Sequence, residues 1–287
     1  MPEQAVKFVA PEVHIMGGVC ITDWEFQVLA KKLLDDTGIN LTLSKKSMIE
    51  GRLSSRLREL SIHSFKEYIE FIKKTPSEGE VFINALTTNK TDFFREPEHF
   101  NYLTKTVLPE FLAKNPEKKF RLWSGASSTG EEIYTLSIVL NEFFGSHHGY
   151  DYKIVGTDID TEVLDQAKAG IYARHVIQCV RPDLLAKYFK KVGAVTSDKY
   201  EVSAELKRLV KFRQFNLLKS EFQVPIKFDV IFLRNVLIYF LPETIEIVIK
   251  RMYQHLKPGG YLFLGHSEAL TSINHSFKYL KNSIYVK

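Results

Sequence analysis

A loop of glycine, serine and acidic residues, Ser124 to Glu132 (Ser-Gly-Ala-Ser-Ser-Thr-Gly-Glu-Glu), holds the groups with the clearest chemical potential. It follows a short strand-like run and leads into a helical pattern that begins at Glu131. Its glycines let a ligand approach the backbone closely, and amides at the start of the helix would face that ligand. Such a loop can bind a nucleotide or activate a serine, or it can simply connect a strand to a helix.

Three known loop motifs do not fit this segment. A P-loop requires lysine after its last glycine, but Gly130 is followed by Glu131, which would repel a phosphate. A dinucleotide fingerprint requires a further glycine between Gly125 and Gly130 and an acid about 20 residues on, whereas Asp158 lies farther away. A nucleophile elbow requires glycine where Thr129 stands. Two acids at the helix start favour S-adenosylmethionine, which carries a positive charge and hydroxyls, and a turn without a ligand is the alternative.

The next candidate is Asp158, in the segment Gly-Thr-Asp-Ile-Asp that ends at Asp160. Asp158 directly follows the strand-like run 153–157. A carboxylate at this position in an α/β sheet can accept hydrogen bonds from the ribose hydroxyls of a nucleoside. Asp160 stands where it would cap the following helix. We therefore expect Asp158 to contact a ligand and Asp160 to have a structural role.

Polar residues also follow later strand-like runs, at Asn216 with Leu217 and at Arg234 with Asn235. Asparagine can bind an adenine edge or the amino-acid end of a cofactor, although it often only closes a turn. A different run, Leu86 to Pro97, combines Arg95 with polar residues and two aromatics. It can close over a ligand; alternatively, Thr91 caps a helix, and Phe93 and Phe94 belong to the core.

Two kinds of structure must position these residues. The chain from Thr22 is helical at first, because Thr22 and Glu25 have capping-box spacing and apolar residues recur at helical intervals. After about Phe120, short apolar runs at 121–124, 153–157, 228–233 and 261–264 alternate with helical patterns. This alternation predicts an α/β fold with a doubly wound, mostly parallel sheet covered on both faces.

The domain boundaries follow from this change of pattern. We predict a small all-helical domain at residues 20–88 and an α/β domain at residues 89–287. Residues 190–212 interrupt the alternation and are rich in glycine, threonine, serine and tyrosine. They are predicted to form a small β insertion, either a hairpin or a three-stranded flap.

Basic residues gather on one predicted helix of the N-terminal domain. At about 100° per residue, Lys45, Arg52 and Arg56 lie within a narrow strip of one helix face. The strip flanks an apolar stripe, Ile49, Leu53, Leu57 and Leu60, which is expected to pack inward. The basic strip is either a solvated face or a docking surface for an acidic partner.

Composition excludes several other classes of protein. The chain has 287 residues, two cysteines and a formal net charge of +5, which argues against a disulfide framework and gives no case for nucleic-acid binding. No apolar run approaches the roughly 20 residues that span a bilayer, and Met1 to Ala10 lack the apolar core of a signal peptide. No histidine or cysteine cluster has metal-ligand spacing, since His147 and His148 are adjacent. We expect a cytoplasmic protein without a metal.

Five segments together resemble the chemotaxis-receptor glutamate O-methyltransferases, the CheR family: residues 87–95, 123–132, 156–160, 232–240 and 265–268. The resemblance covers nearly the whole chain and depends on the order and spacing of these segments. One departure is Ile133, where many relatives have proline. The resemblance implies a Rossmann-like methyltransferase fold, the cofactor S-adenosylmethionine with S-adenosylhomocysteine as its product, and glutamate γ-methyl esters made on the cytoplasmic helices of a methyl-accepting chemoreceptor. It favours a monomer, with the N-terminal domain docking on the receptor.

The resemblance also implies roles for individual residues. Those that would contact the cofactor are Asn89, Thr91, Arg95, Glu132, Asp158, Asn216, Leu217, Arg234 and Asn235. Arg95 and Tyr239 would lie nearest to the transferred methyl group. A glutamate acceptor is already ionised at pH 7, so no general base is required, and His266 is expected to be structural. Two alternatives remain: a serine hydrolase that uses Ser127 or Ser128 with His266, and a non-catalytic adaptor that keeps the fold.

Overall fold

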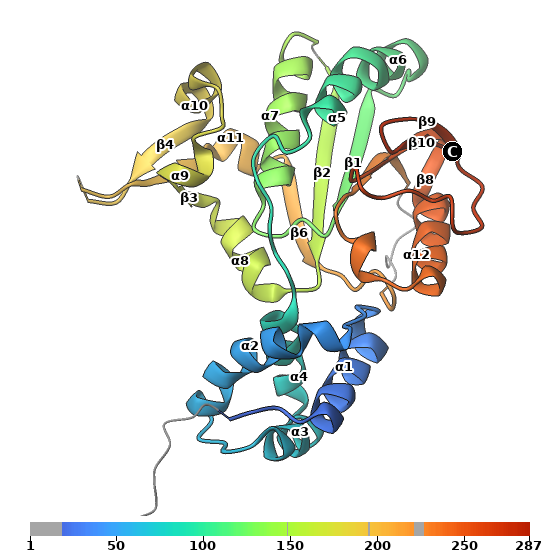
Figure 1. The fold of residues 1–287 in the computed structure, drawn as a ribbon. Helices are drawn as coiled ribbons and strands as arrows, with labels where there is room; N and C mark the ends of the chain where they lie inside the picture. Colours follow the sequence, from blue (N-terminus) through green and yellow to red (C-terminus); the bar gives the residue numbers. More distant parts are fainter. Residues whose placement is uncertain (1–18, 148, 195, 221–226) are drawn as a thin grey trace, which may run out of the picture.

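The computed structural model describes residues 19–147, 149–194, 196–220 and 227–287, and Met1 to Ala10 lie outside them. Figure 1 shows a helical N-terminal part below a larger part that is built on a sheet. Within the described residues, no helix is long and apolar enough to cross a membrane.

The N-terminal part is built from short helices, namely α1 (Asp23–Thr37), the 3-10 turn η1 (Leu43–Lys45), α2 (Lys46–Glu59), α3 (Phe65–Lys74) and α4 (Pro76–Leu86). The predicted capping box is confirmed, because the Thr22 side chain accepts a hydrogen bond from the Glu25 amide and the Glu25 carboxylate accepts one from the Thr22 amide. Ile49, Leu53 and Leu57 are buried. They belong to a hydrophobic core whose buried members all come from this part of the chain.

The larger part contains a seven-stranded sheet in the order β6-β2-β1-β7-β8-β10-β9. Its strands are β1 (Lys119–Gly125), β2 (Asp151–Asp158), β6 (Val210–Gln214), β7 (Phe228–Leu233), β8 (Leu256–Leu264), β9 (Lys278–Lys281) and β10 (Ile284–Val286). Pairing is parallel from β6 to β8, and β10 pairs antiparallel with β8 and β9. The predicted mostly parallel sheet is confirmed.

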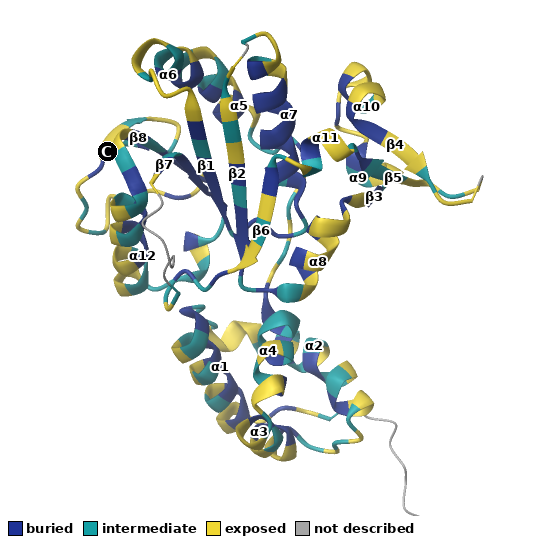
Figure 2. Cartoon of the chain, turned by 180° about the vertical axis from the view of Figure 1, so that it is seen from behind, coloured by how far each residue is buried: buried dark blue, intermediate teal, exposed yellow. Residues whose placement is uncertain are grey.

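Both faces of the sheet are covered, and most residues of β1 and β7 are buried (Figure 2). Leu122 and Phe232 belong to a core on one face together with residues of α7 (Glu131–Gly145). Trp123 and Ile231, their neighbours in the chain, belong to a core on the other face with residues of α12 (Pro242–His255). Because neighbouring strand residues point to opposite faces, burial on both sides explains why these strands are continuous apolar runs.

The remaining helices connect the two parts and the strands. The short helices α5 (Pro97–Tyr102), the π-helix η2 (Leu103–Val107) and α6 (Leu108–Lys114) lead into β1. Helix α8 (Thr161–Ala169) follows β2, and the 3-10 turn η3 (Leu237–Tyr239) follows β7. The described chain thus places a loop and then a helix after β1, β2 and β7.

The bounds predicted for the β insertion, residues 190–212, are wrong. A second sheet in the order β3-β5-β4 is formed by β3 (Ile171–Ala173), β4 (Phe189–Val192) and β5 (Lys199–Val202), with the short helices α9 (Arg174–Ile177), α10 (Pro182–Tyr188) and α11 (Ala204–Lys207) around it. Residues 210–212 belong instead to β6, which pairs with β2 in the main sheet. As a half-exposed edge strand, β6 alternates apolar and charged residues, so its sequence resembles the insertion strands that precede it.

Several contacts hold the helical part against the ends of the main-sheet strands. The Asn40 amide donates to the Tyr239 carbonyl at 2.8 Å, next to an antiparallel bridge between Ile39 and Phe240. The Asn216 side-chain amide donates to the Asp36 carbonyl at 2.7 Å. The segment that follows α1 is therefore fixed over the carboxyl ends of the strands.

Candidate active site

A cavity of about 610 Å³ lies between the helical part and the carboxyl ends of β1, β2, β6 and β7. Its volume is within the roughly 300–1,000 Å³ of typical small-molecule sites. It is lined by all the residues predicted to contact the cofactor: Asn89, Thr91, Arg95, Glu132, Asp158, Asn216, Leu217, Arg234 and Asn235. Tyr239, Lys45 and Arg52 line it as well, whereas Arg56 does not.

The glycine-serine loop after β1 is held by Asp158, which ends β2. The Ser128 amide donates to Asp158 Oδ2 at 2.8 Å, and the Asp160 amide donates to Asp158 Oδ1 at 3.1 Å. Ala126 and Ser128 adopt positive φ angles of 62° and 49°, which curve the loop tightly. Burial raises the pKa of Asp158 to about 6, although the amide donors partly oppose this shift. The carboxylate is thus buried at the cavity with incomplete compensation for its charge.

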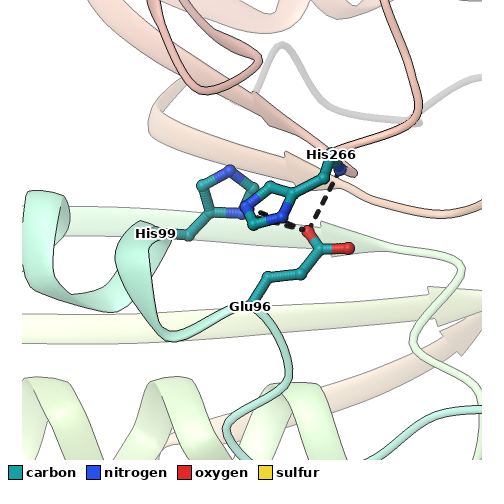
Figure 3. A group of neighbouring side chains, drawn as sticks. All are labelled: Glu96, His99 and His266. Atoms are coloured by element: carbon teal, nitrogen blue, oxygen red, sulfur yellow. Dashed lines mark hydrogen bonds and ion pairs between the residues drawn. The ribbon is translucent and has the colours of Figure 1, made fainter.

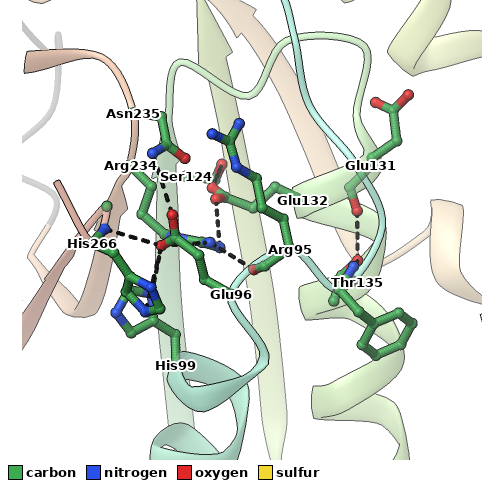
Figure 4. Close-up of polar contacts among 12 residues, drawn as sticks. Arg95, Glu96, His99, Ser124, Glu131, Glu132, Thr135, Arg234, Asn235 and His266 are labelled. Atoms are coloured by element: carbon green, nitrogen blue, oxygen red, sulfur yellow. Dashed lines mark hydrogen bonds and ion pairs between the residues drawn. The ribbon is translucent and has the colours of Figure 1, made fainter. Parts of the chain in front are cut away.

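Glu132, on the first turn of α7, is held from two sides (Figure 4). Ser124 Oγ donates to its Oε1 at 2.8 Å, and Arg234 Nη1 lies 3.1 Å from its Oε2. Burial raises the pKa of Glu132, and the nearby Arg234 guanidinium lowers it in part. The sequence placed Ser124 and Glu132 in the same loop, but it did not predict the hydrogen bond between their side chains.

The segment between α4 and α5 crosses the cavity as a strap, residues 87–96. Asn89 and Thr87 donate to Asp160 Oδ2, both at 2.7 Å, and Ser128 Oγ donates to the Asn89 carbonyl at 2.8 Å. Asp160 also accepts from the first amides of α8, so its predicted capping role is confirmed. Phe93 is buried against Tyr172 and Phe189, while Arg95, partly buried, lines the cavity.

Asn216, which lines the cavity as predicted, also has a structural role. Its side-chain Nδ2 donates to the Asp36 carbonyl, and its Oδ1 accepts from the amides of Leu218 and Lys219. The side chain therefore closes a turn and anchors α1. These bonds use the side-chain oxygen and one of the two amide N–H groups, and the second N–H is left for a ligand in the cavity that Asn216 and Leu217 line.

The predicted basic strip is only partly available for docking. Lys45 is exposed at the cavity, and Arg52 donates to the Thr87 carbonyl at 2.5 Å. Arg56 forms a two-bond ion pair with Glu78, which also accepts from the Tyr68 hydroxyl. Burial raises the pKa of Glu78, but the hydrogen bonds from Arg56 and Tyr68 lower it by more. The pKa is therefore below its ordinary value, and the carboxyl stays ionised at neutral pH. Arg56 is therefore less available for docking than the sequence suggested, because Glu78 balances its charge inside the domain.

Glu96, His99 and His266 bring their ligand atoms within 4.8 Å of one another (Figure 3). Glu96 Oε2 is already paired with Arg234 Nη2 at 3.0 Å and accepts a hydrogen bond from the His266 amide at 3.2 Å. Burial lowers the pKa of His99 to about 4, so this ring is neutral near pH 7. The sequence missed the cluster because His266 lies 170 residues from Glu96.

The arrangement gives no support to a serine hydrolase. Ser128 Oγ donates to the Asn89 carbonyl, and the His266 ring neighbours Glu96, Glu98 and His99. Among the residues that the structure describes, no contact joins Ser127 or Ser128 to His266.

Comparison with known proteins identifies related chains. Residues 24–87 match the model of the CheR methyltransferase all-alpha domain, and residues 89–286 match that of the CheR methyltransferase SAM-binding domain. Chemotaxis protein methyltransferase 2 of Pseudomonas aeruginosa is 39% identical over 261 residues, covering 91% of this chain and 92% of that protein. The chemotaxis protein methyltransferase of Klebsiella aerogenes is 38% identical, covering 92% and 90%. That of Escherichia coli is 36% identical, covering 93% and 92%.

Proposed function

Because the chain belongs to the CheR methyltransferase family, we propose that its cavity binds S-adenosylmethionine and that the acceptors are glutamate side chains of a chemoreceptor. The chain is an S-adenosylmethionine-dependent protein methyltransferase that acts on chemoreceptors. The observation that carries the residue-level proposal is the 610 Å³ cavity lined by Asp158, Glu132 and Arg95. Two buried acids and a cation suit a ligand with ribose hydroxyls, an amino group and a carboxylate.

Each side of the cavity has a chemical task. Asp158 accepts hydrogen bonds from the ribose hydroxyls, and its negative charge strengthens these bonds. Glu132, held by Ser124 and Arg234, presents negative charge toward the amino-acid end of the ligand. Asn89, Thr91, Asn235 and the Asn216–Leu217 backbone complete the walls, and Leu217 offers an apolar surface to the base.

The methyl transfer needs alignment more than proton transfer. Bound S-adenosylmethionine would supply an activated methyl on a sulfonium to a carboxylate oxygen of the acceptor, and the electron pair of the broken C–S bond would stay on sulfur. No proton moves, because the glutamate is already ionised at pH 7. Arg95 and Tyr239 line the cavity, where they orient the acceptor and exclude water, and positioning supplies much of the rate.

The receptor docks on the side of the cavity formed by the N-terminal helices. Lys45 and Arg52 lie at the cavity, and they attract the acidic cytoplasmic helices of the receptor. We place the protein in the cytoplasm as a monomer. Lys45→Glu is expected to raise the KM for receptor severalfold, more at low salt than at high salt, and to change the affinity for S-adenosylhomocysteine by a smaller factor.

The matched control is Lys66→Glu, the same charge change at an exposed position of α3. Figure 1 shows α3 on the side of the helical part away from the sheet. Equal KM values for the two variants at low salt would remove Lys45 from the docking surface.

Thermal unfolding with different ligands tests the cofactor assignment. A ligand at about 100 times its Kd stabilises the native state by about 2.7 kcal/mol, which raises the Tm by several degrees for a domain of this size. S-adenosylmethionine and S-adenosylhomocysteine are expected to raise the Tm in this way, and NAD is not. A shift with NAD alone would contradict the assignment.

A further inference from the structure

The backbone around Arg95 is strained on both sides. Phe94 and Glu96 have φ angles of 54° and 56°, a left-handed conformation that residues other than glycine rarely adopt. Strain of this kind persists only where surrounding contacts hold it. Because Arg95 lies between these two residues, the contacts that maintain them also set the direction of the Arg95 side chain.

Three groups of the strained turn, the Phe94 amide, the Arg95 carbonyl and the Glu96 carboxylate, are held by contacts with the rest of the protein (Figure 4). The Phe94 amide donates to Thr135 Oγ1 at 3.1 Å. The Arg95 carbonyl accepts from Arg234 Nη2 at 2.6 Å. The Glu96 carboxylate accepts from that same Nη2 at 3.0 Å and from the His266 amide at 3.2 Å, and its other oxygen lies 3.3 Å from Asn235 Nδ2. Glu96 is therefore the acidic anchor of the turn.

Arg234 connects this anchor to the cofactor cavity. Its side chain is 1% exposed and contacts Glu132 through Nη1 and Glu96 through Nη2. The two carboxylates hold the two ends of this buried guanidinium in place, and loss of either would leave one end without its charged partner. Loss of the Glu96 charge would leave Arg234 free to turn toward Glu132 and to release the Arg95 carbonyl.

We propose that Glu96 is a positioning residue for methyl transfer: it fixes Arg234 and the strained turn so that Arg95 points into the cavity. The inference rests on the proposed function, in which Arg95 acts beside the transferred methyl. Glu96 itself acts through Arg95 and Arg234 and need not touch either substrate. Its removal is therefore expected to lower kcat while receptor docking, which uses the N-terminal helices, is unchanged.

Glu96→Gln tests the proposal because it removes the charge and preserves the shape. A misplaced reacting group can cost about 100-fold in rate, so we expect kcat to fall about 10- to 100-fold while the KM for receptor stays within about twofold. Glu98→Gln is the matched control, since Glu98 lies two residues away, has a 54% exposed side chain and lies 3.8 Å from His266 Nε2. The control is expected to retain wild-type kcat.

A double-mutant cycle separates positioning from a general structural effect. In an Arg95→Lys background, Glu96→Gln is expected to add less than about a twofold loss, because the group that Glu96 positions has already been changed. Fully multiplicative losses would overturn the proposal. Thr135→Val, which removes the bond to the Phe94 amide while keeping the side-chain shape, supplies a second variant and is expected to lower kcat in the same way.

Two controls make each outcome decisive. Circular dichroism and the midpoint of thermal unfolding verify that every variant is folded. If the wild-type protein transfers methyl groups and both Glu96→Gln and Thr135→Val keep its kcat, the positioning role is overturned. If the wild-type protein transfers none, the proposed function fails instead.

Discussion

The affinity for S-adenosylhomocysteine is expected to depend on the ionisation of Asp158. The pKa of this buried carboxyl is raised to about 6 in the free protein. Ribose hydroxyls donate to the ionised form, so the binding-competent form is nearly fully present above pH 7 and is lost as the pH falls through 6. With a pKa of about 6, the ionised fraction falls from about 90% at pH 7 to about 10% at pH 5.

The apparent Kd rises in inverse proportion to the competent fraction. We therefore expect the Kd to increase about tenfold between pH 7 and pH 5, which corresponds to about 1.4 kcal/mol, and to change little between pH 7 and pH 8. Isothermal titration calorimetry with S-adenosylhomocysteine at these pH values measures the effect directly.

Asp158→Asn is the control for this titration. The variant keeps the size of the side chain but cannot ionise, and it loses charge-assisted hydrogen bonds worth about 1.5–3 kcal/mol. It should bind weakly at every pH and show no tenfold step. A flat Kd in the wild-type protein would refute the reasoning; an unchanged step in Asp158→Asn would assign the titration to another group, such as Glu132.

Three further expectations concern other residues. Arg95→Ala should lower kcat/KM about 100- to 1,000-fold with a nearly unchanged Tm in thermal unfolding. Glu78→Gln should destabilise the protein by about 1–3 kcal/mol in urea unfolding, because it breaks the pair between this buried carboxylate and the partly exposed Arg56. Glu59→Gln, which removes the 60% exposed partner of the same arginine, should cost less than about 1 kcal/mol. Gly38→Ala should lower the free energy of unfolding by about 1–2 kcal/mol, because Gly38 has a φ of 81° and a new Cβ would lie 2.8 Å from Thr244. Gly51→Ala, with open space around it, should be neutral or stabilising. Equal unfolding midpoints within either matched pair would contradict the corresponding reasoning.

The strands and helices that pack on both sides were predictable because burial leaves a direct mark on the sequence. Phe228–Leu233 is a continuous apolar run since both of its faces are covered, and Thr22 with Glu25 marks the start of α1 through chemistry local to four residues. The edge strand β6 was missed because half of it faces solvent. Its alternating charged residues are equally typical of a surface hairpin.

The candidate site was predictable in outline and not in its pairings. Parallel strands bring their carboxyl ends to one edge, so the residues after β1, β2 and β7 were expected to meet. Which side chains bond there depends on tertiary packing that periodicity does not encode. The partner of Arg56 lies 22 residues away on another helix, and the partner of Asn216 is a backbone carbonyl 180 residues away. The strained turn at Phe94 and Glu96 likewise depends on contacts with Arg234.

Transfer of a labelled methyl group tests the central claim most directly. The purified protein is incubated with methyl-labelled S-adenosylmethionine and with membranes that contain chemoreceptors, and the receptor band is then treated with mild base. We expect label on the receptor that base releases as methanol, as for a glutamate methyl ester. When Arg95→Ala replaces the wild-type protein, labelling is expected to be at least about 100-fold slower. A wild-type protein that binds S-adenosylhomocysteine by calorimetry yet leaves every receptor unlabelled would contradict the account and indicate a non-catalytic adaptor.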